Sequence, residues 1–375
     1  MSLAIQNDRR SASGDDSNLD FAKLDPGVRK KLRELCKVDN YHAPLALLFD
    51  YLVIAVSVYL SVGVSYFFYP ISILLIGSTQ RALVNVLHES SHKVLAKNGR
   101  WNVTLGTIFS GYLVLHMYNP YRNSHIGFHH RFLGDPEKDP DYNFHVGVGI
   151  YDHRVSDKRF FLKNIAMAVL GFRTLEYVNY VVRDRVLFKP ENVSVSMPIR
   201  LRTERVAMLA QWATIVGVCA WMGWLWYLLF FWFVPLFTVA IAIGWLSELA
   251  EHYPLPESES KQVLMTRNRH GWTIERFLLG RHNDNYHLVH HLNTGVPFWN
   301  MKRAHHVLLT DPSYSRWDGL WAGILTRSPG RKNQETLVSY ASKYRQFCRD
   351  GGDPSNVDGG GTFAEAAALA RAMGT

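Results

Sequence analysis

Residues 206–247, VAMLAQWATIVGVCAWMGWLWYLLFFWFVPLFTVAIAIGWLS, form a run of 42 positions without a charged side chain. As one helix this run would extend about 63 Å, twice the roughly 30 Å hydrocarbon thickness of a bilayer. The run must therefore fold back on itself, and Trp221-Met-Gly223-Trp224 is the expected turn. We therefore predict two membrane-spanning helices in this run, one before the turn and one after it.

Two further apolar stretches precede this run. Residues 44–64 carry a single charge, Asp50, and residues 67–87 have Pro70 near their start, where proline suits the first turn of a helix. The four segments predict an all-α integral membrane protein with about four transmembrane helices in two hairpins. Residues 101–118 are expected to form an interfacial or re-entrant helix, and residues 160–182 an amphipathic helix lying on the membrane.

The distribution of charge predicts the orientation of these helices. Of 41 Lys and Arg, eight precede the first span, 17 lie between Lys93 and Arg205, and 15 follow Glu248, which leaves Arg81 alone inside a span. Because cytoplasmic loops collect Lys and Arg, both termini should lie on the cytoplasmic side of the inner membrane. The net charge of +9 includes no basic patch interleaved with aromatics, so nucleic-acid binding is not expected. The three cysteines have no metal-binding spacing, and no disulfide is predicted.

Nine histidines occur in four short clusters beside the apolar runs. They are His88 and His92; His125, His129 and His130; His252; and His287, His290 and His291. Residues four positions apart share a helix face, and neutral imidazole binds first-row metals well. One mononuclear site needs three or four protein ligands, so nine histidines predict two metals in one pocket, held by a cytoplasmic helical cap.

The neighbouring polar residues have less specific patterns. His252 could instead cap a helix end, but it lies where the last span leaves the membrane, level with the other clusters, so we include it as a ligand. His282 is the first alternative ligand, since we expect it on the same helix as His287. Asn285 is either a bonding partner of a ligand or a helix-surface amide. Six further histidines are predicted to be exposed or hydrogen-bonded: His116, His145, His153, His270, His305 and His306. Three aspartates are predicted to form turns and to bond to ligand N–H groups: Asp135, Asp139 and Asp141.

The histidine motifs resemble those of the membrane fatty-acid desaturase superfamily, which includes acyl desaturases, alkane hydroxylases and carotenoid hydroxylases. The resemblance rests on His-x-x-x-His at 88–92, His-x-x-x-His-His at 125–130 and Asn-Tyr-His-x-x-His-His at 285–291, and it covers roughly residues 40–325. The Glu251-His252-Tyr253 element is similar to a motif of the alkane-hydroxylase branch. Similarity to the superfamily implies two Fe²⁺ ions, O2 as oxidant, and electrons from a separate ferredoxin or cytochrome, because the sequence has no His-Pro-Gly-Gly haem motif.

We therefore predict an O2-dependent di-iron desaturase that introduces a C=C bond into an unactivated alkyl segment, with a fatty acyl or lipid-like compound as the expected substrate. Many acyl desaturases have Phe-Pro where this chain has Asn293-Thr294-Gly295, so two related activities remain open. One is hydroxylation of a lipid or alkane. The other is desaturation of a small secondary metabolite, such as the amino-acid toxin precursor dihydrorhizobitoxine, which bacterial members of the superfamily also desaturate.

Two alternatives come from other functional classes. His88-Glu-Ser-Ser-His92 alone matches the zinc-protease pattern, with Glu89 as general base, and would make the protein an intramembrane protease. A non-catalytic membrane protein that binds or transports metal is the second alternative.

The sequence divides into three predicted regions. Residues 1–40 comprise a polar tail and a basic amphipathic helix at the membrane surface, residues 41–330 the membrane desaturase domain, and residues 331–375 a C-terminal helix with a Gly- and Ala-rich tail.

Overall fold

The protein is described by a computed structural model that covers residues 23–183, 187–188, 193–355 and 362–372. Within these residues the regular elements are helices, and the one isolated β-bridge joins Trp321 to Glu335. Three helical stretches are long and apolar enough to cross a membrane: His42–Val64, Tyr66–Ser91 and Leu225–Ser258. The all-α membrane character predicted from the sequence is therefore confirmed at this coarser level.

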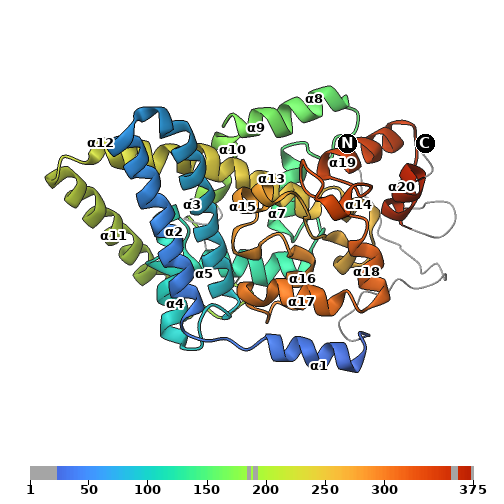
Figure 1. The fold of residues 1–375 in the computed structure, drawn as a ribbon, viewed down its shortest axis with the longest axis horizontal. Coiled ribbons are helices and arrows are strands. Elements are labelled where there is room, and N and C mark those ends of the chain that lie inside the picture. The colour runs from blue at the N-terminus through green and yellow to red at the C-terminus, as the bar shows by residue number, and fades with distance from the viewer. Residues whose placement is uncertain (1–22, 184–186, 189–192, 356–361, 373–375) are drawn as a thin grey trace.

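The first two stretches form a hairpin. α2 (His42–Tyr59) and α3 (Tyr69–Ser91) lie side by side in Figure 1, and Pro70 occupies the first turn of α3 as predicted. The hydroxyl of Ser61 donates to Ser72 Oγ at 2.8 Å, and that of Ser72 donates to the carbonyl of Ser57 at 2.7 Å. These buried hydrogen bonds fix the two helices to each other.

The long uncharged run breaks where the sequence indicates. α11 (Leu201–Trp221) ends at the predicted turn and α12 (Leu225–Leu228) follows, with Gly223 at φ +72°, a conformation that favours glycine. From α12 the chain continues through π-helical turns into α13 (Ile241–His252), so that α11 and α12 meet at one edge of the molecule (Figure 1). α11 is not among the three candidate spans, and its first turns carry Arg202, Glu204 and Arg205.

Neither predicted surface helix is one continuous helix, so that part of the two predictions was wrong, whereas their location at the membrane stays a prediction. Residues 101–118 divide into α4 (Gly99–Thr107), a 3-10 turn and the start of α5 (Tyr118–Arg122). Residues 160–182 divide among α8 (Asp157–Phe161), α9 (Met167–Val169) and α10 (Thr174–Val181), with Gly171 at φ +83° between the last two. Positive φ angles stop helix propagation, and helical periodicity does not reveal them.

α1 (Pro26–Leu35) is amphipathic, as predicted, and its location at the membrane surface stays a prediction. Val28, Leu32 and Leu35 are buried in a core shared with α17 (Met301–Leu308). The basic residues of α1 lie on its other, exposed face. The helix therefore packs on protein and presents charge outward.

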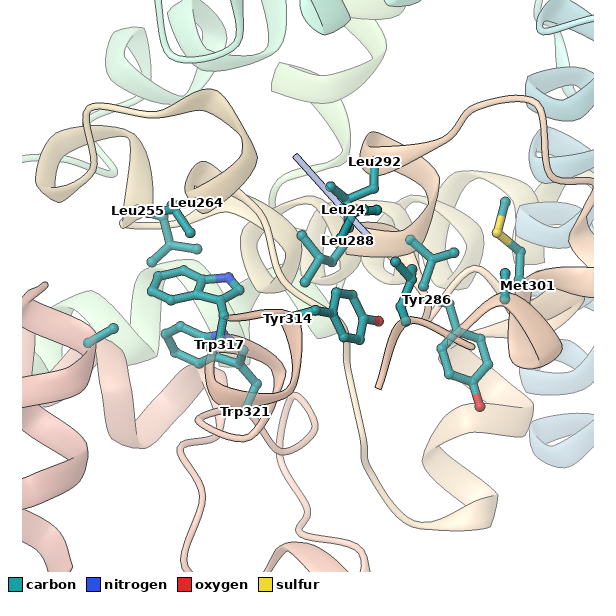
Figure 2. Close-up of a cluster of buried hydrophobic side chains, with 14 of the residues drawn as sticks. Leu24, Leu255, Leu264, Tyr286, Leu288, Leu292, Met301, Tyr314, Trp317 and Trp321 are labelled. Atoms are coloured by element: carbon teal, nitrogen blue, oxygen red, sulfur yellow. The ribbon is translucent and has the colours of Figure 1, made fainter. Parts of the chain in front are cut away.

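The largest core cluster supports α16 (His287–Leu292). Figure 2 shows Leu288 and Leu292 of this helix among Tyr314, Trp317 and Leu264. Because α16 buries these side chains, its histidines face the opposite way. The remaining helices are α6 (His130–Phe132), α7 (Pro140–Gly147), α14 (Leu255–Ser258), α15 (Thr273–Leu279), α18 (Pro312–Asp318), α19 (Leu337–Arg349) and α20 (Phe363–Ala372).

Candidate metal centre

All nine predicted histidines converge at the ends of four helical segments. The segments are the C-terminal end of α3, a π-helical turn over residues 123–129 that runs into α6, the last residue of α13, and α16. π-helical turns often occur at functional sites, since the extra residue changes which side chains share a face. Here the turn brings the second histidine cluster to the first and third clusters.

Five histidines form the first group: His88, His92, His125, His130 and His290. Four of their Nε2 atoms form a closed ring in the order His88, His290, His130, His125, with successive separations of 2.9, 3.0, 3.0 and 3.0 Å. A neutral imidazole nitrogen carries one proton or none, so hydrogen bonds can account for at most half of these contacts. Nitrogens that bind one metal at right angles through bonds of about 2.1 Å lie about 3.0 Å apart. The spacing therefore fits a shared metal.

His92 completes this group from the end of α3. Its buried Nε2 has no hydrogen-bond partner among the described residues, and its ring centroid lies 4.7 Å from that of His290. A buried polar atom without a partner is unfavourable unless a ligand or ion satisfies it. This observation agrees with a metal ion at the first group.

Four histidines form the second group: His129, His252, His287 and His291. The Nε2 of His287 lies 3.0 Å from that of His252 and 3.1 Å from that of His291. His252, which has no partner at helical spacing in the sequence, is oriented by a contact of 2.9 Å between its Nδ1 and the carbonyl of Met265. Its other nitrogen thus faces the group.

Carboxylates surround the second group. Asp139 Oδ1 lies 3.1 Å and Asp141 Oδ2 3.5 Å from Nδ1 of His129. Burial alone would lower the pKa of His129, but these two carboxylates raise it to about 9. Asp135 accepts from two backbone N–H groups and closes a turn, as predicted, but within the described residues it does not contact a histidine of the centre. The arrangement of Asp139 and Asp141 fixes which nitrogen of His129 faces the centre.

The structure excludes His282 from both groups. We expected His282 on one helix with His287, but its φ of +58° interrupts the helix, and α16 begins only at His287. Its Nε2 lies 2.8 Å from Asp50. Asn285 is likewise not a helix-surface amide: it is buried, and its Nδ2 donates to the carbonyl of Arg269 at 3.2 Å.

Other histidines pair with protein groups, as predicted. His153 lies 2.7 Å from Glu257, and His305 Nδ1 lies 2.7 Å from the hydroxyl of Tyr314. His270 Nε2 lies 2.9 Å from Oδ1 of the buried Asp318. His270, His305 and Asp318 form a third group of side chains that could bind a metal, and the sequence pattern did not indicate it. Glu89, the general base of the protease alternative, instead accepts a hydrogen bond of 2.8 Å from the backbone N–H of Phe298.

A cavity of about 350 Å³ lies beside the two groups, and sequence reasoning did not find it. His88, His125, His129, His252 and His287 contribute to its wall. Further along, the wall combines apolar residues of α10, α11 and the helix before α13 with polar ones, among them Gln80, Arg81, Tyr177 and Glu248. Four more carboxylates line the same cavity: Asp139, Asp141, Glu251 and Asp284. The one available sequence signal was Arg81, since ionisable residues inside spans usually face a cavity.

The family model for fatty acid desaturases matches residues 65–321. This protein is a member of the fatty acid desaturase family. A search of curated proteins also finds a relative, the dihydrorhizobitoxine desaturase of Bradyrhizobium elkanii, with 38% identity over 303 residues, which are 80% of this chain and 85% of the relative. As a family member the protein is a membrane oxidoreductase of the desaturase class, as its motifs indicated, and neither a zinc protease nor a metal transporter.

Proposed function

We propose that this desaturase holds two iron ions, one in each histidine group, with all nine imidazoles as ligands. The single observation that supports this most strongly is the ring of four Nε2 atoms with separations of 2.9–3.0 Å. When bound, the irons supply the chemistry that uses O2, two electrons and two protons to remove two hydrogens from adjacent carbons, giving a C=C bond and two waters.

The chain's own residues orient the imidazoles and exclude water. Asp139 and the carbonyl of Met265 each hold the Nδ1 of a ligand, His129 and His252 respectively, which leaves Nε2 for the metal. Five of the nine side chains are buried, namely His88, His125, His129, His287 and His290, and the cavity adjoins the centre. Substrate position in that cavity decides which C–H bonds are attacked.

We propose a small amphipathic metabolite as the substrate, like the one named for the relative from B. elkanii, in place of the lipid-like substrate first expected. Arg81 and Glu248 in the cavity wall support this choice. A buried charge beside an alkyl chain is unfavourable, whereas it can bind a charged group of a small metabolite.

The topology we propose has four spans, with α11 as the third, and with both termini and the metal centre in the cytoplasm. The excess of Lys and Arg outside the spans supports it. Reporter fusions at Lys97 and Lys163 should give cytoplasmic signals, and a fusion at Tyr66 an external one. An external signal at Lys163 would refute this topology.

A separate acidic ferredoxin or cytochrome is the proposed electron donor. The exposed face of α1 with the adjoining α17 carries a cluster of cations, and opposite charges speed the association of electron-transfer proteins. The residues are Lys30, Lys31, Arg33, Lys37, Lys302 and Arg303.

The proposed function is tested with detergent-purified, iron-loaded protein, a reducing system and O2. Dihydrorhizobitoxine and an acyl substrate are supplied separately, and products are analysed by mass spectrometry. Loss of two hydrogen masses indicates desaturation, and gain of one oxygen mass would show a hydroxylase instead. Stoichiometric zinc in the active protein would refute the di-iron centre.

A further inference from the structure

We propose that the cavity recognises its substrate as a zwitterionic α-amino acid, with Arg81 binding the carboxylate and Glu248 the ammonium group. The inference rests on the proposed function, because it concerns the substrate of the same centre. It adds the substrate's charged groups and the residues that bind each of them.

Arg81 is the one cation of the chain inside a predicted span, and its side chain remains 15% exposed in the cavity wall. Within the described residues its guanidinium donates to Asn85 and lies 3.8 Å from Asp284. A guanidinium has five N–H donors in a planar fork, so donors remain for a carboxylate. A charge at this depth in a membrane is costly and is usually kept for function.

Glu248 lies one helical turn along α13 from Gly244, the residue beside Arg81. A Cβ added to Gly244 would be 3.7 Å from both Arg81 Nε and the hydroxyl of Tyr177, so these polar groups flank Gly244. Glu248 follows Gly244 by four residues on the same face of α13, and its side chain is 26% exposed at the cavity. One helical turn is about 5.4 Å, so the backbone of Glu248 lies about that far along α13 from the residue beside Arg81.

Gln80 provides an independent observation that points to a ligand. Its side chain is fully buried, and its Nε2 donates to the carbonyl of Trp232 at 2.8 Å. Its Oε1 accepts no hydrogen bond within the described part of the chain, although it belongs to a residue of the cavity wall. A buried acceptor without a donor is unfavourable, and an N–H or O–H of the substrate would satisfy it.

These residues place the charged end of the substrate away from the metals. Arg81 precedes His88 by seven residues on α3, about 10.5 Å of helix, and Glu248 precedes His252 by four on α13, about 6 Å. The side chain of a bound amino acid would extend over this distance toward the imidazoles. Its C–H bonds, beyond the α carbon, would then meet the centre.

The experiment compares dihydrorhizobitoxine with its carboxamide and its N-acetylated forms, using iron-loaded enzyme. Wild type should favour the free amino acid by at least about tenfold in kcat/KM, since each charge-assisted hydrogen bond is stronger than a neutral one. Arg81→Gln should raise the KM for the acid at least about tenfold and abolish its preference over the carboxamide, and Arg81→Lys should restore part of that preference. Glu248→Gln should abolish the preference for the free amine. Met208→Leu, an uncharged change in the same wall, should leave both preferences intact.

Equal turnover of acid and carboxamide by wild type would overturn the inference even if Arg81 variants fail to fold. So would an equal rise in KM for both compounds in Arg81→Gln. Desaturation of an acyl substrate without turnover of the amino acid would refute amino-acid recognition but leave the di-iron desaturase standing. Absence of O2-dependent desaturation with every substrate would instead refute the proposed function.

Discussion

Replacing His252 by alanine tests whether the second histidine group is a separate metal position. The Nε2 of His252 lies 3.0 Å from that of His287, and the His252 ring centroid lies 5.0 Å from that of His129. The substitution reduces this group from four imidazoles to three and leaves the group of five unchanged. We therefore expect His252→Ala to bind about one iron per chain where wild type binds two, because a metal site needs its full ligand set.

Activity should fall more than about tenfold, since loss of even an indirect metal contact commonly costs 10–100-fold. Folding should survive. The variant loses one hydrogen bond, to the carbonyl of Met265, which contributes about 1 kcal/mol against a typical stability of about 5–15 kcal/mol. The assay combines metal analysis of purified protein with product analysis by mass spectrometry.

The control variant is His306→Ala, because His306 is exposed on α17. His270 would be a poor control, since its Nε2 pairs with the buried Asp318. If His252→Ala retains two irons and normal activity, the second group is not a metal position with His252 as ligand. Loss of both irons would show that the two groups do not bind independently.

Asp139→Asn should weaken iron binding or activity about 10–100-fold, because Asp139 orients His129; an unchanged metal titration would contradict that role. Reversing charge at Lys31 and Arg303 should raise the KM for an acidic ferredoxin severalfold without affecting dithionite-driven turnover, whereas Lys158→Glu on α8 should change neither. Metal-free protein should lose thermal stability as pH falls below about 6.5, the ordinary pKa of histidine. Burial lowers the pKa of most imidazoles of the metal centre that lie outside the spans. Below about pH 6.5 the unfolded chain therefore takes up protons that the folded chain does not. His129, whose pKa is raised, opposes this trend. A melting temperature that stays constant between pH 7 and pH 5 would refute this account.

The convergence of the histidines could be predicted because it depends on short-range spacing. His88 and His92 lie within four positions, and so do His287 and His291, so helix geometry alone places each pair on one face. The turn at Gly223 could also be predicted, since bilayer thickness limits the length of a helix. The first inference needs only the local sequence, and the second needs the local sequence and the thickness of the bilayer.

Other features depend on contacts between distant segments. The stretch before α16 reads as helix, yet His282 adopts a left-handed conformation and pairs with Asp50, more than 200 residues away in the chain. The cavity arises where α3 packs near α13, which brings Arg81 close to Gly244. No spacing within one segment encodes such a pairing, and so the polar wall of the cavity appears only in the folded structure.

The position of Arg81 near the middle of α3 has a consequence for how the protein enters its membrane. An isolated helix with Arg81 near its middle would insert at a cost of about 2.5–3.5 kcal/mol for that residue alone. The hydrogen bonds that join Ser57 and Ser61 of the first stretch to Ser72 of α3 need only these two neighbouring segments, so they can form before any later helix is synthesised. We therefore expect the α2–α3 pair to stay beside the insertion channel during biosynthesis until α13 arrives to enclose Arg81.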